Sequence, residues 1–168
     1  MDKIRNELER AYELATNAGN YEGAFAICNR IVDENPNIPD GLRKRAAIYA
    51  AKCDFIRAVA DITQAIEIES EVPEYYFFRG WWHLELGNFE QAYEDQSAAI
   101  NLGNTHDFHY HDESAFFFRA TALLHLRRFE EALADCKRVR DDFLIYLRRF
   151  GKLDKAEVVR NAMARRAS

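Results

Sequence analysis

Apolar residues along this chain recur with helical spacing inside segments that repeat every 34 residues. Aligning the sequence with itself superimposes four short stretches, each with an aromatic residue three positions before an alanine: 19–24, 53–58, 87–92 and, after 40 residues, 127–132. Asn or Asp precedes the aromatic residue in three of the four. Such a side chain caps a helix well, because its oxygen accepts from an unpaired backbone N–H. Each stretch therefore predicts a tight turn that opens a second helix.

A helical run precedes each turn, for example at 75–86, where Gly80 leaves room for a neighbouring helix. Pro39 and Pro73 stand at the starts of repeats, where a first-turn proline loses no helical hydrogen bond. Two helices in each repeat predict an all-helical single domain spanning 1–168. Its units are expected at 5–38, 39–72, 73–106 and 113–146.

The third repeat, from Phe78 to Ala92, resembles a tetratricopeptide unit of the kind common in bacterial proteins. The resemblance covers most of the chain, and the small residue of the second helix matches in all four units. It departs at positions where tryptophan is typical, such as Leu8. The resemblance implies a right-handed α-solenoid of about four helix-turn-helix repeats, in a short stand-alone array that binds other proteins and is not an enzyme.

The chain after the fourth unit leaves the repeat. Neither proline nor glycine occurs from Glu130 to Arg149, so one long helix is expected there. Residues 150–152 would turn into a last helix at about 153–166. Ala156, Val159 and Met163 would form its apolar face at i, i+3 and i+7, as in a capping helix that covers the end of an array.

An arginine and an aspartate recur together in three of the units. The seventh residue of units two to four is an arginine and the twenty-third is an aspartate, whereas unit one lacks both, with Ala11 and Ile27 instead. Two positions on facing helices that change together indicate contact. We therefore expect an ion pair between the two helices of each unit: Arg45 with Asp61, Arg79 with Asp95, and Arg119 with Asp135.

In tetratricopeptide arrays the first helices line a concave groove, and the resemblance implies such a groove here. It would be basic at one end and aromatic at the other, and exposed aromatic patches mark interaction sites. Two other interpretations remain open: the final helices fold back into the groove, or these aromatic residues belong to the core. The residues expected to contact a partner are Arg43, Lys44, Glu74, Phe77, Phe78, Trp81, Phe117, Phe118, Thr121 and His125.

The insertion between units three and four, His106 to His111, holds three histidines, and acidic residues lie beside them. Such a cluster could ligate a transition metal, but its spacing matches no established motif and an exposed polar loop explains it as well. Asp112 is expected to cap the helix that follows it. The sequence contains no phosphate-binding loop or nucleophile motif, so no catalytic residue, metal or cofactor is expected.

Charge narrows the class of partner, and cysteine content indicates the compartment. The net charge of residues 146–168 is +5 and that of residues 1–145 is −10, which gives −5 for the whole chain. An acidic body disfavours nucleic acid as the partner, and no long apolar run predicts a membrane span. Three widely spaced cysteines and a charged start favour the cytoplasm.

The function expected is an adaptor or scaffold that binds a protein or peptide segment as a monomer or weak homodimer. The alternatives are an immunity protein that neutralises a toxin, a secretion chaperone, a metal-binding protein using the His106–His111 loop, and a self-associating structural array.

Overall fold

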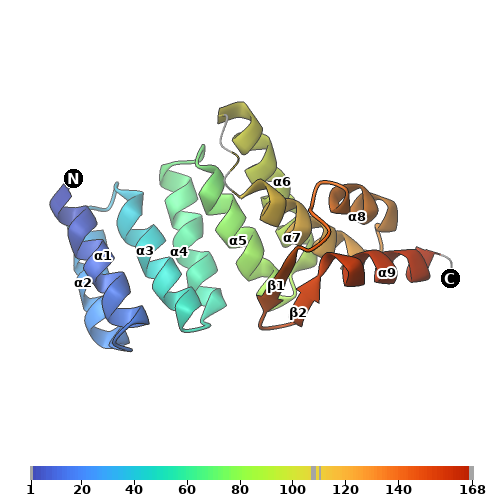
Figure 1. Cartoon of the computed structure of the whole chain (residues 1–168). Coiled ribbons are helices and arrows are strands. Elements are labelled where there is room, and N and C mark those ends of the chain that lie inside the picture. Colours follow the sequence, from blue (N-terminus) through green and yellow to red (C-terminus); the bar gives the residue numbers. More distant parts are fainter. Residues whose placement is uncertain (1, 107–108, 110, 167–168) are drawn as a thin grey trace. The chain divides into compact units, whose positions relative to one another are not determined.

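The structure is a computed structural model of the chain, and it describes residues 2–106, 109 and 111–166 (Figure 1). Internal contacts divide the chain into two units, 1–75 and 76–168, and each is described by itself. Within the described residues, none of the helices combines the length and the apolar character that a membrane span requires.

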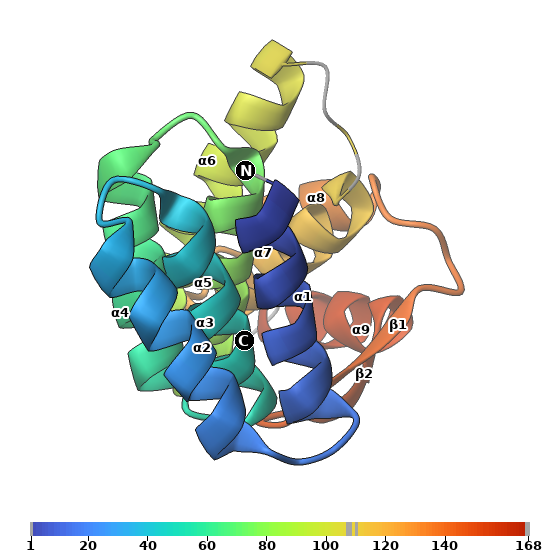
Figure 2. The same ribbon diagram turned by 90° about the vertical axis from the view of Figure 1, so that its left-hand side faces the viewer.

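The first unit consists of two consecutive helical hairpins. Its helices are α1 (Asp2–Thr16), α2 (Tyr21–Glu34), α3 (Pro39–Ala51) and α4 (Phe55–Ile68). Helix α3 packs against both α1 and α2, and α4 packs against α3 (Figure 2). The predicted order of helix, tight turn and second helix is confirmed. The core between α1, α2 and α3 consists of small and aliphatic side chains: Leu8, Ala11, Ala15, Ala24, Cys28, Ile31 and Ile48.

The tight turns have the chemistry that the sequence predicts. The side chains of Asn20 and Asp54 accept hydrogen bonds from the backbone N–H three residues later, at 2.9 and 3.3 Å, and so cap α2 and α4. The residue just before each cap has a positive φ: +65° at Gly19 and +63° at Cys53. Glycine adopts this conformation freely, whereas a side chain such as that of Cys53 is strained there.

The second unit starts within α5 (Pro73–Leu86) and continues with further helices and a short hairpin. Its later elements are α6 (Phe89–His106), α7 (Asp112–His125), α8 (Phe129–Cys136), β1 (Leu144–Leu147), β2 (Gly151–Asp154) and α9 (Lys155–Arg166). Helix α7 packs against α6 and α8. Three phenylalanines of α7, residues 116–118, lie in the core of this unit.

The prediction of one long helix from Glu130 to Arg149 is wrong. Helix α8 ends at Cys136, and residues 144–154 form an antiparallel hairpin in which Leu144 pairs with Asp154 and Leu147 with Gly151. The physical reason lies in the run from Phe143 to Leu147, because aromatic and β-branched residues favour strands. Gly151, with a φ of +74°, then supplies the turn.

Helix α9 is present at the predicted place but presents a different face to the rest of the unit. It packs against α7 and α8 and buries Val158 and Ala162 completely. Of the predicted apolar face of Ala156, Val159 and Met163, Ala156 is exposed and Met163 is 57% exposed, whereas Val159 is partly buried against that core. The prediction of this face as the packing face is therefore wrong by about one residue.

The three predicted arginine–aspartate pairs are confirmed. Each arginine donates from Nε and from an Nη to the two carboxylate oxygens of its aspartate, at distances from 2.6 to 2.9 Å. The aspartates are nearly buried, and this two-point geometry is the strong form of the interaction. The arginines also bind a neighbouring helix: Arg45 donates to Asn29 at 2.8 Å and Arg119 to Ser97 at 3.3 Å.

Candidate functional site

Most of the aromatic residues predicted to line a groove are core residues. Phe77 is 5% exposed, Phe117 0% and Phe118 1%, and Thr121, at 1%, donates its hydroxyl to the carbonyl oxygen of Phe117. The Phe77 ring stacks on the His111 ring at 4.1 Å between centroids and lies 5.6 Å from that of Phe118. The expectation that these four residues are exposed is therefore wrong.

The residue that precedes the C-terminal hairpin covers part of Phe117. The ring of Phe143 packs against Phe117, with 4.9 Å between centroids. At the turn, the backbone N–H groups of Arg148 and Arg149 each donate to the carboxylate of Glu85, both at 2.9 Å. Of the interpretations that the sequence leaves open, the structure supports the one that places these aromatic residues in the core. The C-terminal segment also returns onto the helices of this unit, with the hairpin turn on Glu85 of α5 and α9 on α7 and α8.

Gly87 lies beside the same contact, and its backbone conformation favours glycine. Its φ of +80° suits glycine, and a Cβ atom built on it would approach the Arg149 guanidinium carbon to 2.7 Å. The hairpin turn thus lies directly against the turn between α5 and α6.

Three of the predicted site residues in the second unit keep part of their surface accessible. Phe78 and Trp81 are half-buried, and the buried indole nitrogen of Trp81 has no hydrogen-bond partner among the described residues. His125 is stacked on Phe89 at 4.2 Å and lies 5.2 Å from Phe150. Desolvation by these neighbours, aided by the positive charges of Arg165 and Arg149, lowers the pKa of His125 below its usual value.

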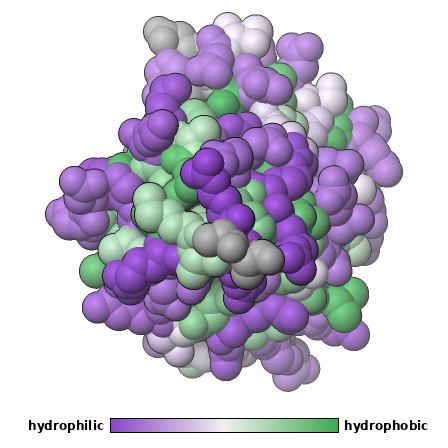
Figure 3. Space-filling view, turned by 90° about the vertical axis from the view of Figure 1, so that its right-hand side faces the viewer, coloured by the Kyte–Doolittle hydropathy of each residue, from purple (hydrophilic) through white to green (hydrophobic). Residues whose placement is uncertain are grey.

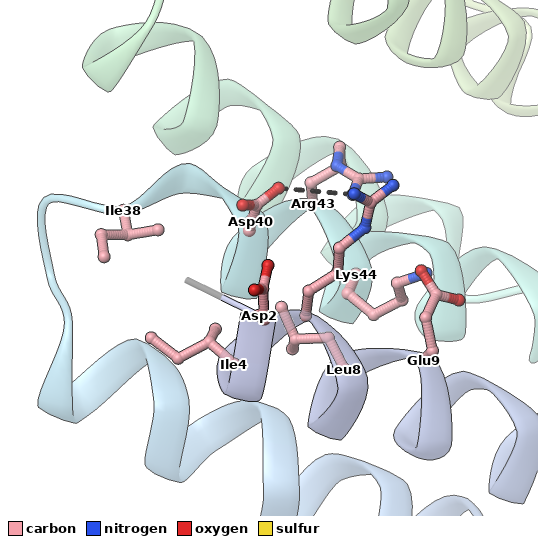
Figure 4. A pocket seen from close by; sticks show the side chains of 9 residues that line it. Asp2, Ile4, Leu8, Glu9, Ile38, Asp40, Arg43 and Lys44 are labelled. Atoms are coloured by element: carbon pink, nitrogen blue, oxygen red, sulfur yellow. Dashed lines mark hydrogen bonds and ion pairs between the residues drawn. The ribbon is translucent and has the colours of Figure 1, made fainter.

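An open cavity lies in the first unit instead, between α1 and α3 (Figure 4). Its volume is about 290 Å³. Two of the predicted site residues, Arg43 and Lys44, line it, whereas Glu74 lies half-buried in the first turn of α5. Aliphatic side chains form one part of the wall and charged side chains the rest. The full lining is Asp2, Ile4, Arg5, Leu8, Glu9, Ile38, Asp40, Arg43 and Lys44.

Two ion pairs order the charged side of this cavity. Lys44 is 7% exposed and donates to Glu9 at 2.9 Å, with its ammonium 5.0 Å from the centre of the Tyr12 ring. The hydrogen bond from Lys44, supported by Arg43 and Arg5, lowers the pKa of Glu9. Arg43 donates to Asp40 at 3.3 Å.

Asp2 and Arg5 are the charged lining residues that form no ion pair among the described residues. Asp2 stands on the rim near Asp40, on the side of the cavity that carries Ile4 and Ile38 (Figure 4). Two rim carboxylates beside an aliphatic wall can hold a basic side chain, because the wall receives its methylene stem while the carboxylates receive its charge.

Three residues that line this cavity could not be predicted from the repeat pattern. Asp2 and Ile4 precede the first predicted unit, and Ile38 closes it, so a frame that counts inward positions within each unit omits all three. The repeat does predict that the first helices of consecutive units pack side by side. That packing alone would have placed the start of α1 beside the start of α3.

The histidine segment forms local contacts in the part that the structure describes. His109 Nδ1 lies 2.8 Å from a carboxylate oxygen of Asp112, and His111 stacks on Phe77. Asp107, Phe108 and Tyr110 lie outside the described residues, and among the others no three metal-binding side chains gather. The predicted cap by Asp112 is wrong: α7 begins at Asp112 itself, and His111 precedes it without a side-chain cap.

Comparison with known proteins identifies the fold. A scan against models of known protein families finds no match. Over 133 residues the chain is 26% identical to human serine/threonine-protein phosphatase 5. The match covers 76% of this chain and 26% of that protein, so the chain spans about a quarter of its length.

Two solved structures extend the comparison over most of the chain. MamA from Desulfovibrio magneticus RS-1, residues 41 to its end, superposes with a TM-score of 0.69 at 16% identity, covering 82% of this chain and 72% of that one. YrrB, described as a TPR protein with an unusual peptide-binding site, gives a TM-score of 0.64 at 17% identity, covering 75% of this chain and 62% of that one.

Proposed function

From the tetratricopeptide fold that this chain shares with those structures, we propose that it is a non-catalytic interaction module that holds a segment of a partner protein on its first helices. The observation that carries the proposal is the cavity of about 290 Å³ between α1 and α3. It is formed by consecutive first helices, and its wall combines aliphatic side chains with charges of both signs. The peptide-binding site of YrrB is a precedent for this kind of function on this fold.

The partner segment is basic. Residues 1–75 contain nine basic and fourteen acidic residues and so hold the whole net charge of −5, whereas residues 76–168 are neutral. A lysine or arginine of the partner would place its stem on Ile4 and Ile38 and its charge near Asp2 and Asp40. Opposite charge also speeds the encounter, so the association rate will fall as salt is added.

Cross-linking in the host cell tests where a partner binds. A photoreactive phenylalanine analogue replaces Arg5 at the cavity in one variant, and in a second it replaces Ile56, which is 72% exposed on α4. We expect one protein to be captured from position 5 and not from position 56. Equal capture at both positions, or none at position 5, would contradict the proposal.

Affinity for the captured segment tests the chemistry. Asp2→Lys is expected to weaken binding by about tenfold, the size of effect that reversal of a charge at an interface produces. Asp33→Lys, an equal change of charge at an exposed position of α2, is the matched control. If both variants weaken binding to the same extent, net charge and not the cavity determines the affinity.

A further inference from the structure

In each helix pair, the first helix precedes the tight turn and the second helix follows it. Helix α9 occupies the position of a first helix. It packs against both α7 and α8, as α3 packs against α1 and α2. In the pairs α1–α2, α3–α4 and α7–α8, a second helix follows and packs on the first. The outer side of α9 corresponds to the side of a first helix that a second helix covers in those pairs.

A groove runs along this outer side, between α8 and α9. Its cavity has a volume of about 380 Å³. Leu133 and Ala134 of α8 and Val159 and Met163 of α9 form its apolar part, and Met163 is 57% exposed. Figure 3 views the molecule from the side of its C-terminal elements, where hydrophobic residues (green) lie among hydrophilic ones (purple).

The ends of the groove carry mainly positive charge. Lys137 and Lys155 lie at one end, where Lys155 is bonded to Asp141 at 2.7 Å, and Arg166 lies at the other with Glu130, to which it is bonded at 2.6 Å. Lys137 forms no ion pair among the described residues. The segment 146–168, which includes α9, carries +5.

We propose that the groove between α8 and α9 binds an amphipathic helix of another protein, with apolar residues on one face and acidic residues beside it. Such a helix would lie on α9 as a second helix lies on its first helix elsewhere in the fold, with its apolar face on Val159, Met163 and Leu133. Its carboxylates would meet Lys137 and Arg166. This site is separate from the cavity between α1 and α3 and does not depend on it.

A second copy of the chain fits this groove poorly. If two copies joined through the same groove, the net positive lining of one copy, including Lys137, would be buried against the net positive lining of the other. Burying like charges against one another opposes association. An acidic helix would instead bring opposite charge to Lys137, which has no ion pair among the described residues.

Two synthetic helical peptides test the proposal with the whole protein. Both are about four turns long and carry leucines along one face; one has glutamates on both flanks, and the other has lysines at the same positions. Fluorescence anisotropy of the labelled peptides measures binding. We expect the glutamate peptide to bind at least about tenfold more tightly than the lysine peptide. Equal affinities, or no binding of the glutamate peptide, would overturn the proposal.

Variants locate the binding. Met163→Glu and Lys137→Glu are each expected to weaken binding of the glutamate peptide by about tenfold, and neither residue is part of the core. Ile56→Glu is the control for an exposed apolar residue elsewhere. The proposal fails if Ile56→Glu weakens binding as much as Met163→Glu does.

Sedimentation of the wild type and Met163→Glu completes the test. We expect both to sediment as the same species. A wild-type dimer that Met163→Glu converts to a monomer would show that a second copy occupies the groove, and that result would overturn the proposal. Asp2→Lys is expected to leave peptide binding unchanged, so the two proposed sites can fail separately.

Discussion

The first helices of the two units use the same repeat position for opposite purposes. Arg43 is the fifth residue of its predicted unit and lines an open cavity, whereas Phe77 and Phe117, the fifth residues of theirs, are buried. The difference arises from what covers each helix. The C-terminal hairpin packs on Phe117 through Phe143, while side chains of α1 and α3 border a cavity. A repeat therefore specifies where a side chain points but not whether another segment of the chain will cover it.

The largest expected difference between the two units comes from truncation at this shared position. Phe117→Ala removes a fully buried ring and is expected to lower the free energy of unfolding by about 3–5 kcal/mol. Arg43→Ala, at the matched position, should change it by less than about 0.5 kcal/mol. Denaturant melts of the two variants measure both values. Equal losses would show that the two faces do not differ in burial.

The arginine–aspartate pairs are common to both units, so their removal should affect both. Asp95→Ala leaves Arg79 half-buried without its partner, and we expect a loss of about 1–3 kcal/mol in chemical denaturation. Combining Arg79→Asp with Asp95→Arg should recover part of that loss. Glu94→Ala, at the exposed neighbouring position, is the control. Melts of Asp95→Ala that coincide with the wild type would show that the pair contributes no stability.

The hairpin contact can be weakened without touching the core. Glu85→Ala removes the acceptor for two backbone N–H groups, and we expect a loss of about 1–2 kcal/mol together with faster hydrogen exchange across 144–154. Glu90→Ala, an exposed glutamate of α6, is the control. Unchanged exchange in the hairpin would mean that packing of Phe143 and Phe150 alone holds it in place.

Acid should weaken the second unit selectively, although by the smallest amount. All five histidines lie in 76–168, and desolvation lowers the pKa of His83 and His125 below 6.5. Because the folded state disfavours the charged form, the stabilisation is complete above the ordinary pKa. It is lost as the pH falls through that value toward the lowered one.

Hydrogen exchange at about pH 7 and about pH 5 would measure this effect in each unit separately. Exchange in the second unit should accelerate, beyond the intrinsic effect of pH, more than exchange in the first. The double substitution of His83 and His125 by glutamine should reduce that difference. If the difference is unchanged in this variant, other groups cause it.

The features that the sequence predicted are those that recur along the chain. The caps at Asn20 and Asp54 and the pair of Arg79 with Asp95 follow from local spacing, since each depends on residues at most 16 apart. The cover over Phe117 and the cavity at Asp2 could not be read in this way. They depend on segments outside the repeat, namely the hairpin and the first residues of α1, and a period contains no information about where such segments pack.

The hydrogen bonds of Glu85 to the hairpin have a consequence for synthesis on the ribosome. They join residues 63 and 64 positions apart, far more than the helix pairs require. During translation, Phe117 and Phe118 leave the ribosome before Phe143, which packs on Phe117, and before the hairpin that follows it. At ordinary elongation rates the 36 residues from Phe118 to Asp154 take roughly two to seven seconds. In that interval the nascent chain displays an aromatic surface that the finished protein conceals, and molecular chaperones act on surfaces of this kind.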